Sequence, residues 1–156
     1  FLLAQYYNTR RLGKMNQKNH PEDAMDFTVR EWMMTLIVEI DPDATVKEAL
    51  SLMRRRYINS LVVKKTETNP EYGIVTTVDV CDKIIAQNRD PSKLKVRDIM
   101  TSPLISISQS ASIQDCAKLM MSLKNRHLPV RDDETGELIG MISATDFLVI
   151  AETMAS

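Results

Sequence analysis

The sequence has little of what metal-binding, nucleic-acid-binding and membrane-spanning proteins usually display. Its 156 residues include only two histidines and two cysteines, with no Cys-x-x-Cys or His-x-x-x-His spacing, so no dedicated metal site is predicted. The charges nearly cancel at −1 without a long block of one sign, which argues against a nucleic-acid-binding surface. No apolar run approaches the roughly 18 to 20 residues that cross a bilayer.

The most informative feature that is present is an internal repeat. Residues 140–146 read Gly-Met-Ile-Ser-Ala-Thr-Asp, and an edited copy, Gly-Ile-Val-Thr-Thr-Val-Asp, lies 67 residues upstream at 73–79. In both copies an apolar strand leads into a helix whose first turn carries the hydroxyl-x-x-acid spacing of a capping box. Glycine occurs only four times, so its presence in both copies predicts a shared need for positive φ or for the close approach of another group.

The same offset of 67 aligns the chain from Val29 with the chain from Val96 without a gap. Each repeat is predicted to contain a first strand (36–40 and 103–107), a capped helix beginning after Thr45 or Ser112, a second strand (60–64 and 127–131), a third strand and a final helix that fades near residue 151 in the second copy. The fold class is therefore α+β, with two β-α-β-β-α units related by a pseudo-twofold axis. The predicted boundaries are 1–28 for an extension, 29–88 and 96–152 for the repeats, 89–95 for a linker and 153–156 for a tail.

The first helix of each repeat is predicted to bury one apolar stripe, because its apolar residues recur at i, i+3, i+4 and i+7. The stripes are Val46, Ala49, Leu50 and Met53 in one copy and Ile113, Cys116, Ala117 and Met120 in the other. Both cysteines, Cys81 and Cys116, align with apolar residues of the other repeat, which predicts small core side chains in a reducing compartment.

Residues 1–28 have no partner in the repeat. The segment 1–7 is predicted to form an amphipathic helix that packs on the body of the protein or on a partner chain. An alternative is the cytoplasmic end of a truncated membrane helix, because Arg10 and Arg11 follow the apolar residues. The chain begins with Phe1 rather than Met, so its start is interpreted as a fragment boundary. Residues 19–23 are predicted to form a linker.

Three segments in the second repeat carry a family resemblance: 96–101, 125–130 and 140–146. In this order and spacing they resemble a CBS domain, and the copy from Val29 resembles a second one. Together they are similar to a CBS pair, or Bateman module, over about residues 29–152. The resemblance implies two units packed through their sheets with two clefts between them, commonly as a homodimer. It also implies a regulatory role in which an adenine nucleotide or adenosyl ligand binds in those clefts.

The resemblance also implies which residues contact the ligand. Asp146 and Asp79 would accept hydrogen bonds from the ribose hydroxyls, Ser143 and Thr76 would lie near phosphate, and Arg126 and His127 would reach the phosphates. Thr145 is a further expected nucleotide contact, and Thr101, Ser102, Leu104 and Ile105 lie where the family forms the adenine pocket. The competing interpretation is that the acids and hydroxyls are only capping-box residues, worth about 1 kcal/mol per helix.

The two clefts are predicted to differ. Asn59 and Ser60 stand in the first repeat where the second has Arg126 and His127. Arginine gives charge-assisted hydrogen bonds to phosphate, so the cleft built chiefly by the second repeat should bind an anionic nucleotide better. The other cleft is expected to be weak, empty or suited to a less charged adenosine ligand.

The sequence thus predicts a cytoplasmic, non-catalytic regulatory module that needs no cofactor and binds AMP, ADP or ATP as a regulatory ligand. We expect a homodimer and an unidentified regulated enzyme or transporter, with no nucleic-acid partner and no membrane span in this chain. Two alternatives remain open. One is a structural dimerisation module without a tightly bound ligand, and the other is the cytoplasmic regulatory fragment of a membrane transporter or channel.

Overall fold

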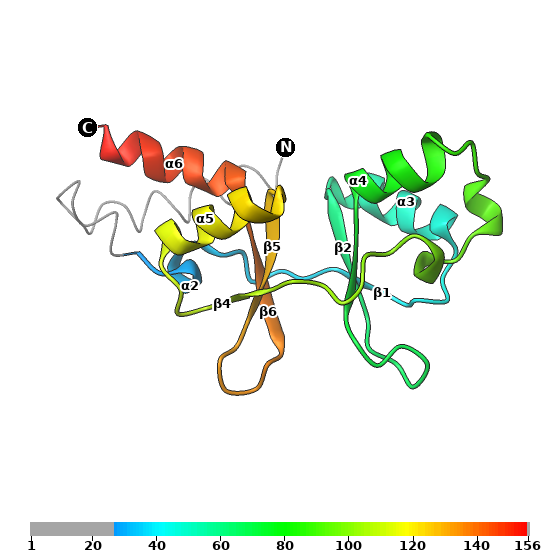
Figure 1. Ribbon diagram of the computed structural model, residues 1–156, viewed down its shortest axis with the longest axis horizontal. Helices are drawn as coiled ribbons and strands as arrows, with labels where there is room; N and C mark the ends of the chain where they lie inside the picture. Colours follow the sequence, from blue (N-terminus) through cyan, green and yellow to red (C-terminus); the bar gives the residue numbers. More distant parts are fainter. Residues whose placement is uncertain (1–26, 156) are drawn as a thin grey trace. The chain divides into compact units, whose positions relative to one another are not determined.

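The structure, a computed structural model, describes residues 27–155, which divide into two compact units. We call unit 1 the described residues 27–36 together with 106–155, and unit 2 residues 37–105. The helix predicted at 1–7 and the linker predicted at 19–23 lie outside the described residues. Each unit contains helices and one mixed sheet of three strands, which confirms the α+β class (Figure 1).

Unit 2 is built on the sheet β1-β2-β3, in which β1 runs parallel and β3 antiparallel to the central β2. Its elements in chain order are β1 (Glu39–Ile40), α3 (Val46–Arg56), β2 (Ser60–Val63), β3 (Gly73–Thr76), α4 (Thr77–Val80), the π-helical turn η2 (Cys81–Ile85), and the 3-10 turns η3 (Pro91–Lys93) and η4 (Val96–Asp98).

Unit 1 repeats this plan with the sheet β4-β5-β6. Its elements are α2 (Val29–Trp32), β4 (Ile107–Ser108), α5 (Ile113–Leu123), β5 (His127–Arg131), β6 (Leu138–Ser143) and α6 (Ala144–Met154). Figure 1 shows α5 and α6, in yellow and red, beside the strands β5 and β6.

The capping signals place the starts of α3 and α5 correctly. Thr45 accepts a hydrogen bond from the backbone N–H of Glu48 at 3.1 Å, and the Glu48 carboxylate accepts one from the N–H of Thr45, also at 3.1 Å. Ser112 accepts one from the N–H of Asp115 at 3.0 Å. Each cap satisfies N–H groups that have no partner inside the helix. Both helices end at the same repeat position, in left-handed residues Tyr57 and Lys124.

Four details differ from the prediction. The first strands contain only Glu39–Ile40 and Ile107–Ser108, because the chain leaves one unit for the other at 36–37 and 105–106, and the residues before those points have no neighbouring strand in the sheet that follows. The last helix continues to Met154.

The prediction that Cys81 is a core residue is wrong, since Cys81 is exposed like its aligned partner Leu148. Ala117 is also exposed, whereas the rest of the two stripes is buried or partly buried.

The units are not the two sequence repeats, because each repeat contributes its first segment to the other repeat's unit. Val29 and Trp32, from the first repeat, are buried in the core of unit 1, while Val96 and Ile99, from the second, are buried in the core of unit 2. Trp32 packs edge-on against Phe27 with ring centroids 5.3 Å apart, a contact worth about 0.5–1.5 kcal/mol beyond its buried area. Neither repeat alone therefore contains a complete core.

Matching backbone hydrogen bonds fix the exchanged segments. Val29 donates to the carbonyl of Ala111 at 2.8 Å, and Val96 donates to the carbonyl of Ala44, the equivalent residue, at 2.9 Å. A second attachment lies near the repeated glycines. Met34 and Met141 exchange two backbone hydrogen bonds of 2.8 and 2.9 Å in unit 1, and Ile74 and Thr101 do the same in unit 2.

The repeated glycines serve close approach. Neither Gly73 nor Gly140 has positive φ. A Cβ at Gly140 would overlap the backbone carbonyl of Met34 and lie 2.9 Å from the sulfur of Met33, whereas a Cβ at Gly73 would lie 2.8 Å from the sulfur of Met100. The methionine side chain can move, but the carbonyl is held by its hydrogen bond to Met141. Close approach, one of the two predicted reasons for these glycines, is thus the one that applies.

We therefore expect Gly140→Ala to destabilise the protein by about 1–3 kcal/mol, the usual cost of overpacking, and to do so more than Gly73→Ala. Urea unfolding of the two variants, which differ only in which exchanged segment is crowded, measures this. Equal and negligible losses would show that the exchanged segments are held by other contacts.

Candidate functional site

The structure separates the predicted contact residues into two sets. Unit 1 holds Arg126, His127, Ser143, Thr145 and Asp146, and unit 2 holds Thr76, Asp79, Thr101, Ser102, Leu104 and Ile105. The residues of the predicted adenine pocket thus lie with Asp79 and not with Asp146. The separation follows from the segment exchange, which carries residues 96–105 of the second repeat into the unit of the first.

In unit 1 the predicted residues meet where β5 begins, β6 ends and α6 starts. His127 is the cross-strand partner of Ser143, and the carbonyl of Arg126 accepts a hydrogen bond from the N–H of Ala144 at 2.9 Å. The Asp146 carboxylate accepts one from the N–H of Ser143 at 2.9 Å, and the hydroxyls of Ser143 and Thr145 are 2.7 Å apart. Hydroxyls, a helix N-terminus and an exposed arginine thus gather at one edge of the sheet, an arrangement suited to a phosphate.

His127 is half-buried next to this edge. Burial lowers the pKa of His127, while the negative charge of nearby Asp146 acts in the opposite direction and offsets part of that effect. At neutral pH the imidazole is therefore uncharged and offers a phosphate an N–H donor rather than a cation. The exposed guanidinium of Arg126 is the permanent positive charge of the pair.

In unit 2 the central group is the carboxylate of Asp79, which is only 4% exposed. One of its oxygens accepts from the N–H of Thr76 at 2.9 Å, as in a capping box. The other accepts from the Thr101 hydroxyl at 2.9 Å and from the ammonium of Lys83 at 2.8 Å. Ser102 and Leu104 continue along the same exchanged segment, and Leu104 donates its N–H to the carbonyl of Tyr72 at 3.0 Å.

The capping interpretation of the two acids holds in both units. Asp79 and Asp146 both accept the N–H of the residue three positions earlier. Within the described residues, no buried side-chain nitrogen or oxygen lacks a hydrogen-bond partner. Neither acid is therefore a group whose burial requires a ligand, and ligand binding there would be added to the capping role.

Sequence reasoning missed two positions. Lys83 lies one helical turn after Asp79, and the i, i+4 acid–base spacing was the signal that could have identified the ion pair. Met34 occupies in unit 1 the position that Thr101 occupies in unit 2. The offset of 67 aligns these two residues, but only the exchange of segments shows that each lies in the unit of the other repeat's acid.

The buried cysteine of unit 1 is chemically inert. Burial raises the pKa of the Cys116 thiol to about 11, so it stays protonated and unreactive in the core, as predicted for a core cysteine. Between residues 27 and 155 no three His, Cys, Asp or Glu side chains gather closely enough to hold a metal ion. In the same part of the chain no helix has the length and apolar character needed to cross a bilayer.

Comparison with known protein families agrees with the internal repeat. The CBS domain model matches the chain twice, over residues 29–86 and 96–152. The chain belongs to the CBS domain family. The two matches begin at the exchanged segments, so each family domain supplies parts to both structural units.

Relatives of this CBS pair include proteins of different lengths. The chain is 32% identical over 114 residues to the uncharacterized protein MK0525 of Methanopyrus kandleri, covering 73% of this chain and 57% of that protein. It is 29% identical over 122 residues to the CBS domain-containing protein YhcV of Bacillus subtilis, covering 78% of this chain and 84% of the relative. The chain thus spans little more than half of the first relative and most of the second.

Solved structures show the same fold. The hexameric CBS-CP12 protein from bloom-forming cyanobacteria is 30% identical to this chain and superposes with a TM-score of 0.72. The match covers 78% of this chain and 66% of the cyanobacterial chain. A CBS pair of this kind therefore occurs within an assembly of several subunits.

The lowered pKa of His127 makes stability depend on pH. As the pH falls, His127 of the unfolded chain binds a proton near pH 6.5, whereas His127 of the folded protein binds one only at a lower pH. The stabilisation that comes from holding His127 neutral is therefore present above about pH 6.5 and is lost as the pH falls through the lower folded pKa. We expect the free energy of unfolding to fall less between pH 7 and pH 5 in His127→Gln than in the wild type. Urea unfolding at each pH measures this, with His20→Gln, which changes the other histidine, as the control. Identical pH profiles for all three proteins would contradict it.

Proposed function

We propose that this CBS pair is a non-catalytic regulatory module and that unit 1 binds an adenine nucleotide. The observation that carries the proposal is the gathering of Arg126, His127, Ser143 and Asp146 at the start of α6. Arg126 and the N-terminus of α6 would bind phosphate, and the Asp146 carboxylate would accept ribose hydroxyls. Membership of the CBS family supports the ligand class, since the resemblance implies adenine nucleotides or adenosyl ligands.

A regulatory role fits the composition of the site better than an enzymatic one. Acyl or phosphoryl transfer would need a nucleophile with an adjacent base. Around the unit 1 site the described candidates are a half-buried histidine of lowered pKa, a buried thiol of raised pKa and the hydroxyls of Ser143 and Thr145, which are hydrogen-bonded to each other. These groups can hold and orient a ligand, which is what a module that reports nucleotide concentration to a partner requires.

The first experiment is thermal unfolding with millimolar AMP, ADP, ATP, S-adenosylmethionine and NAD, with GMP as the base control. A ligand at about 100 times its dissociation constant adds about 2.7 kcal/mol, which raises the midpoint of a chain of this length by roughly 5 to 10 °C. We expect an adenine-selective rise that is lost in Asp146→Ala and reduced in Arg126→Met. Lys118→Met removes a charge from an exposed position of α5 and should respond like the wild type.

Two results would overturn this function. One is a wild type whose midpoint moves by less than about a degree with every ligand. The other is a rise that Asp146→Ala retains in full. In the first case the alternative of a structural association module without a tight ligand would be the better description.

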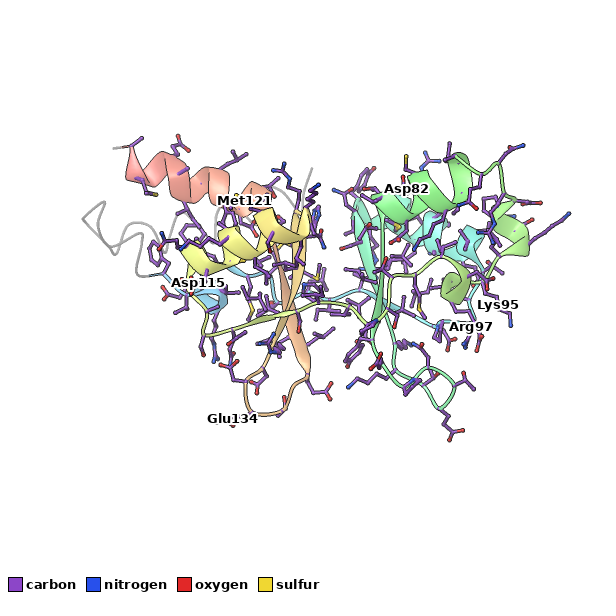
Figure 2. All side chains as sticks on the ribbon, viewed as in Figure 1. Asp82, Lys95, Arg97, Asp115, Met121 and Glu134 are labelled. Carbon is purple, nitrogen blue, oxygen red and sulfur yellow. The ribbon has the colours of Figure 1, made fainter. Side chains whose placement is uncertain are left out.

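We also propose that the chain associates with copies of itself through exposed apolar side chains on its helices, Leu148 among them. Met121 on α5, labelled in Figure 2, and Leu148 on α6 are 76% and 71% exposed, and unit 2 exposes Val78 on α4 and Ile85 on η2 to 62% and 72%. The hexameric state named for the cyanobacterial CBS-CP12 protein supports self-association of this fold.

Sedimentation velocity tests this association. We expect Leu148→Glu to shift the protein to a smaller species, because a carboxylate would have to be buried in the interface. Gln114→Glu adds the same charge at an exposed position of α5 and should leave the assembly unchanged. A monomeric wild type, or an unchanged assembly in Leu148→Glu, would contradict this interface.

A further inference from the structure

The two acids of the repeated motif differ in how the protein surrounds them. The Asp79 carboxylate receives four hydrogen bonds from unit 2 itself. The N–H and hydroxyl of Thr76 donate to one oxygen at 2.9 and 3.4 Å, while Lys83 and the Thr101 hydroxyl donate to the other at 2.8 and 2.9 Å. A carboxylate has about four acceptor positions, so those of Asp79 are filled.

The ammonium group of Lys83 also has a full set of hydrogen-bond partners. Its ammonium donates to Asp79 at 2.8 Å, to the carbonyl of Ile99 at 2.7 Å and to the carbonyl of Met100 at 3.4 Å. These three acceptors match the three donors of an ammonium group. The Asp79 side chain is 6% exposed and that of Lys83 is 35% exposed, so water screens this ion pair less than it screens a surface pair.

Unit 1 has neither of the side-chain donors Lys83 and Thr101 at the equivalent positions. At the offset of 67, Lys83 corresponds to Ile150 and Thr101 to Met34. Neither side chain carries a hydrogen-bond donor, and Ile150 is buried in the apolar core of unit 1. The cap itself is conserved between the two copies, since Ser143 donates to Asp146 as Thr76 donates to Asp79. The two units therefore differ in the side chains that stand at the positions of Lys83 and Thr101.

We propose that Lys83 is a specificity-determining residue that occupies Asp79 and thereby excludes a ribose diol from unit 2. A diol needs a carboxylate that can accept two hydroxyl hydrogen bonds, and Asp79 could offer this only by releasing Lys83 and Thr101. Releasing Lys83 would leave its ammonium partly buried with only carbonyl partners. The inference rests on the proposed nucleotide function, and it concerns binding at Asp79 of unit 2.

A purely structural role for Lys83 makes a different prediction. The ammonium also ties η2 to the exchanged segment through the carbonyls of Ile99 and Met100, so its loss should lower stability in either case. Only the specificity role predicts that removing the ammonium creates a ribose-selective site. The deciding measurement is therefore the binding of neutral adenosine compared with 2′-deoxyadenosine, which lacks one hydroxyl of the diol.

The experiment uses the full chain with the unit 1 site removed by Asp146→Ala. Isothermal titration calorimetry compares Asp146→Ala with Asp146→Ala/Lys83→Met, since methionine keeps the length of the side chain without its charge. We expect the double variant to bind adenosine at least tenfold more tightly than the single variant and to prefer adenosine to 2′-deoxyadenosine. Adding Asp79→Ala should abolish the gain. Lys95→Met is the matched control, because Lys95, labelled in Figure 2, forms an exposed ion pair with Asp43 in the same unit.

The outcomes separate this inference from the proposed function. No gain of adenosine binding in a folded Lys83 variant overturns the role of Lys83, whatever the wild type binds. A gain without preference over 2′-deoxyadenosine also overturns it, since the diol would not be what is recognised. If the wild type binds no adenine nucleotide but Lys83→Met gains adenosine binding, the proposed function fails and the role of Lys83 stands. Should circular dichroism show that Lys83→Met is unfolded, Lys83→Ile, which copies Ile150 of the second repeat, takes its place.

Discussion

The structure depends on the exchange of the first segment of each repeat. Two antiparallel backbone pairs, Met34 with Met141 and Ile74 with Thr101, attach these segments beside the repeated glycines. At Gly140 the attachment depends on the glycine, because a Cβ there would collide with the backbone carbonyl of Met34, whereas at Gly73 a Cβ would crowd the movable side chain of Met100. Core formation depends on it as well, since Trp32 and Val29 fill unit 1 while Ile99 and Val96 fill unit 2.

This exchange also decides which residues surround each acid of the repeated motif. It carries Thr101 and the carbonyls of Ile99 and Met100 to Asp79. Thr101 donates to the Asp79 carboxylate, and Lys83 donates to that carboxylate and to both carbonyls. It carries Met34 to the strand that precedes Asp146. The two copies of one motif therefore have different surroundings although their caps are alike. The two copies of the repeat therefore differ around the acid through residues that lie outside the repeated motif.

The chemistry of the two units follows from these surroundings. Unit 1 combines a permanent charge at Arg126, a neutral imidazole at His127 and an 11-residue helix that starts beside them. Unit 2 has Asn59 and Ser60 in the positions of the basic pair, and its acid is paired with an internal cation. Both differences favour unit 1 over unit 2 for the proposed nucleotide site, and they arise from independent positions in the sequence.

The sequence by itself determined the duplication, the α+β class and the start of each capped helix. These features depend on local spacing, and residues such as Thr45 and Ser112 act on N–H groups within the same turn. Cys116 was identified as a core residue by its place in the helical stripe, whereas Cys81 was misjudged because alignment with an apolar residue does not establish burial. Only the tertiary structure decided that the repeats exchange their first segments, that Thr101 joins Asp79, and that Lys83 binds two carbonyls 16 and 17 residues away. Those contacts join segments distant along the chain, and no local pattern of residues specifies which unit a crossing segment will enter.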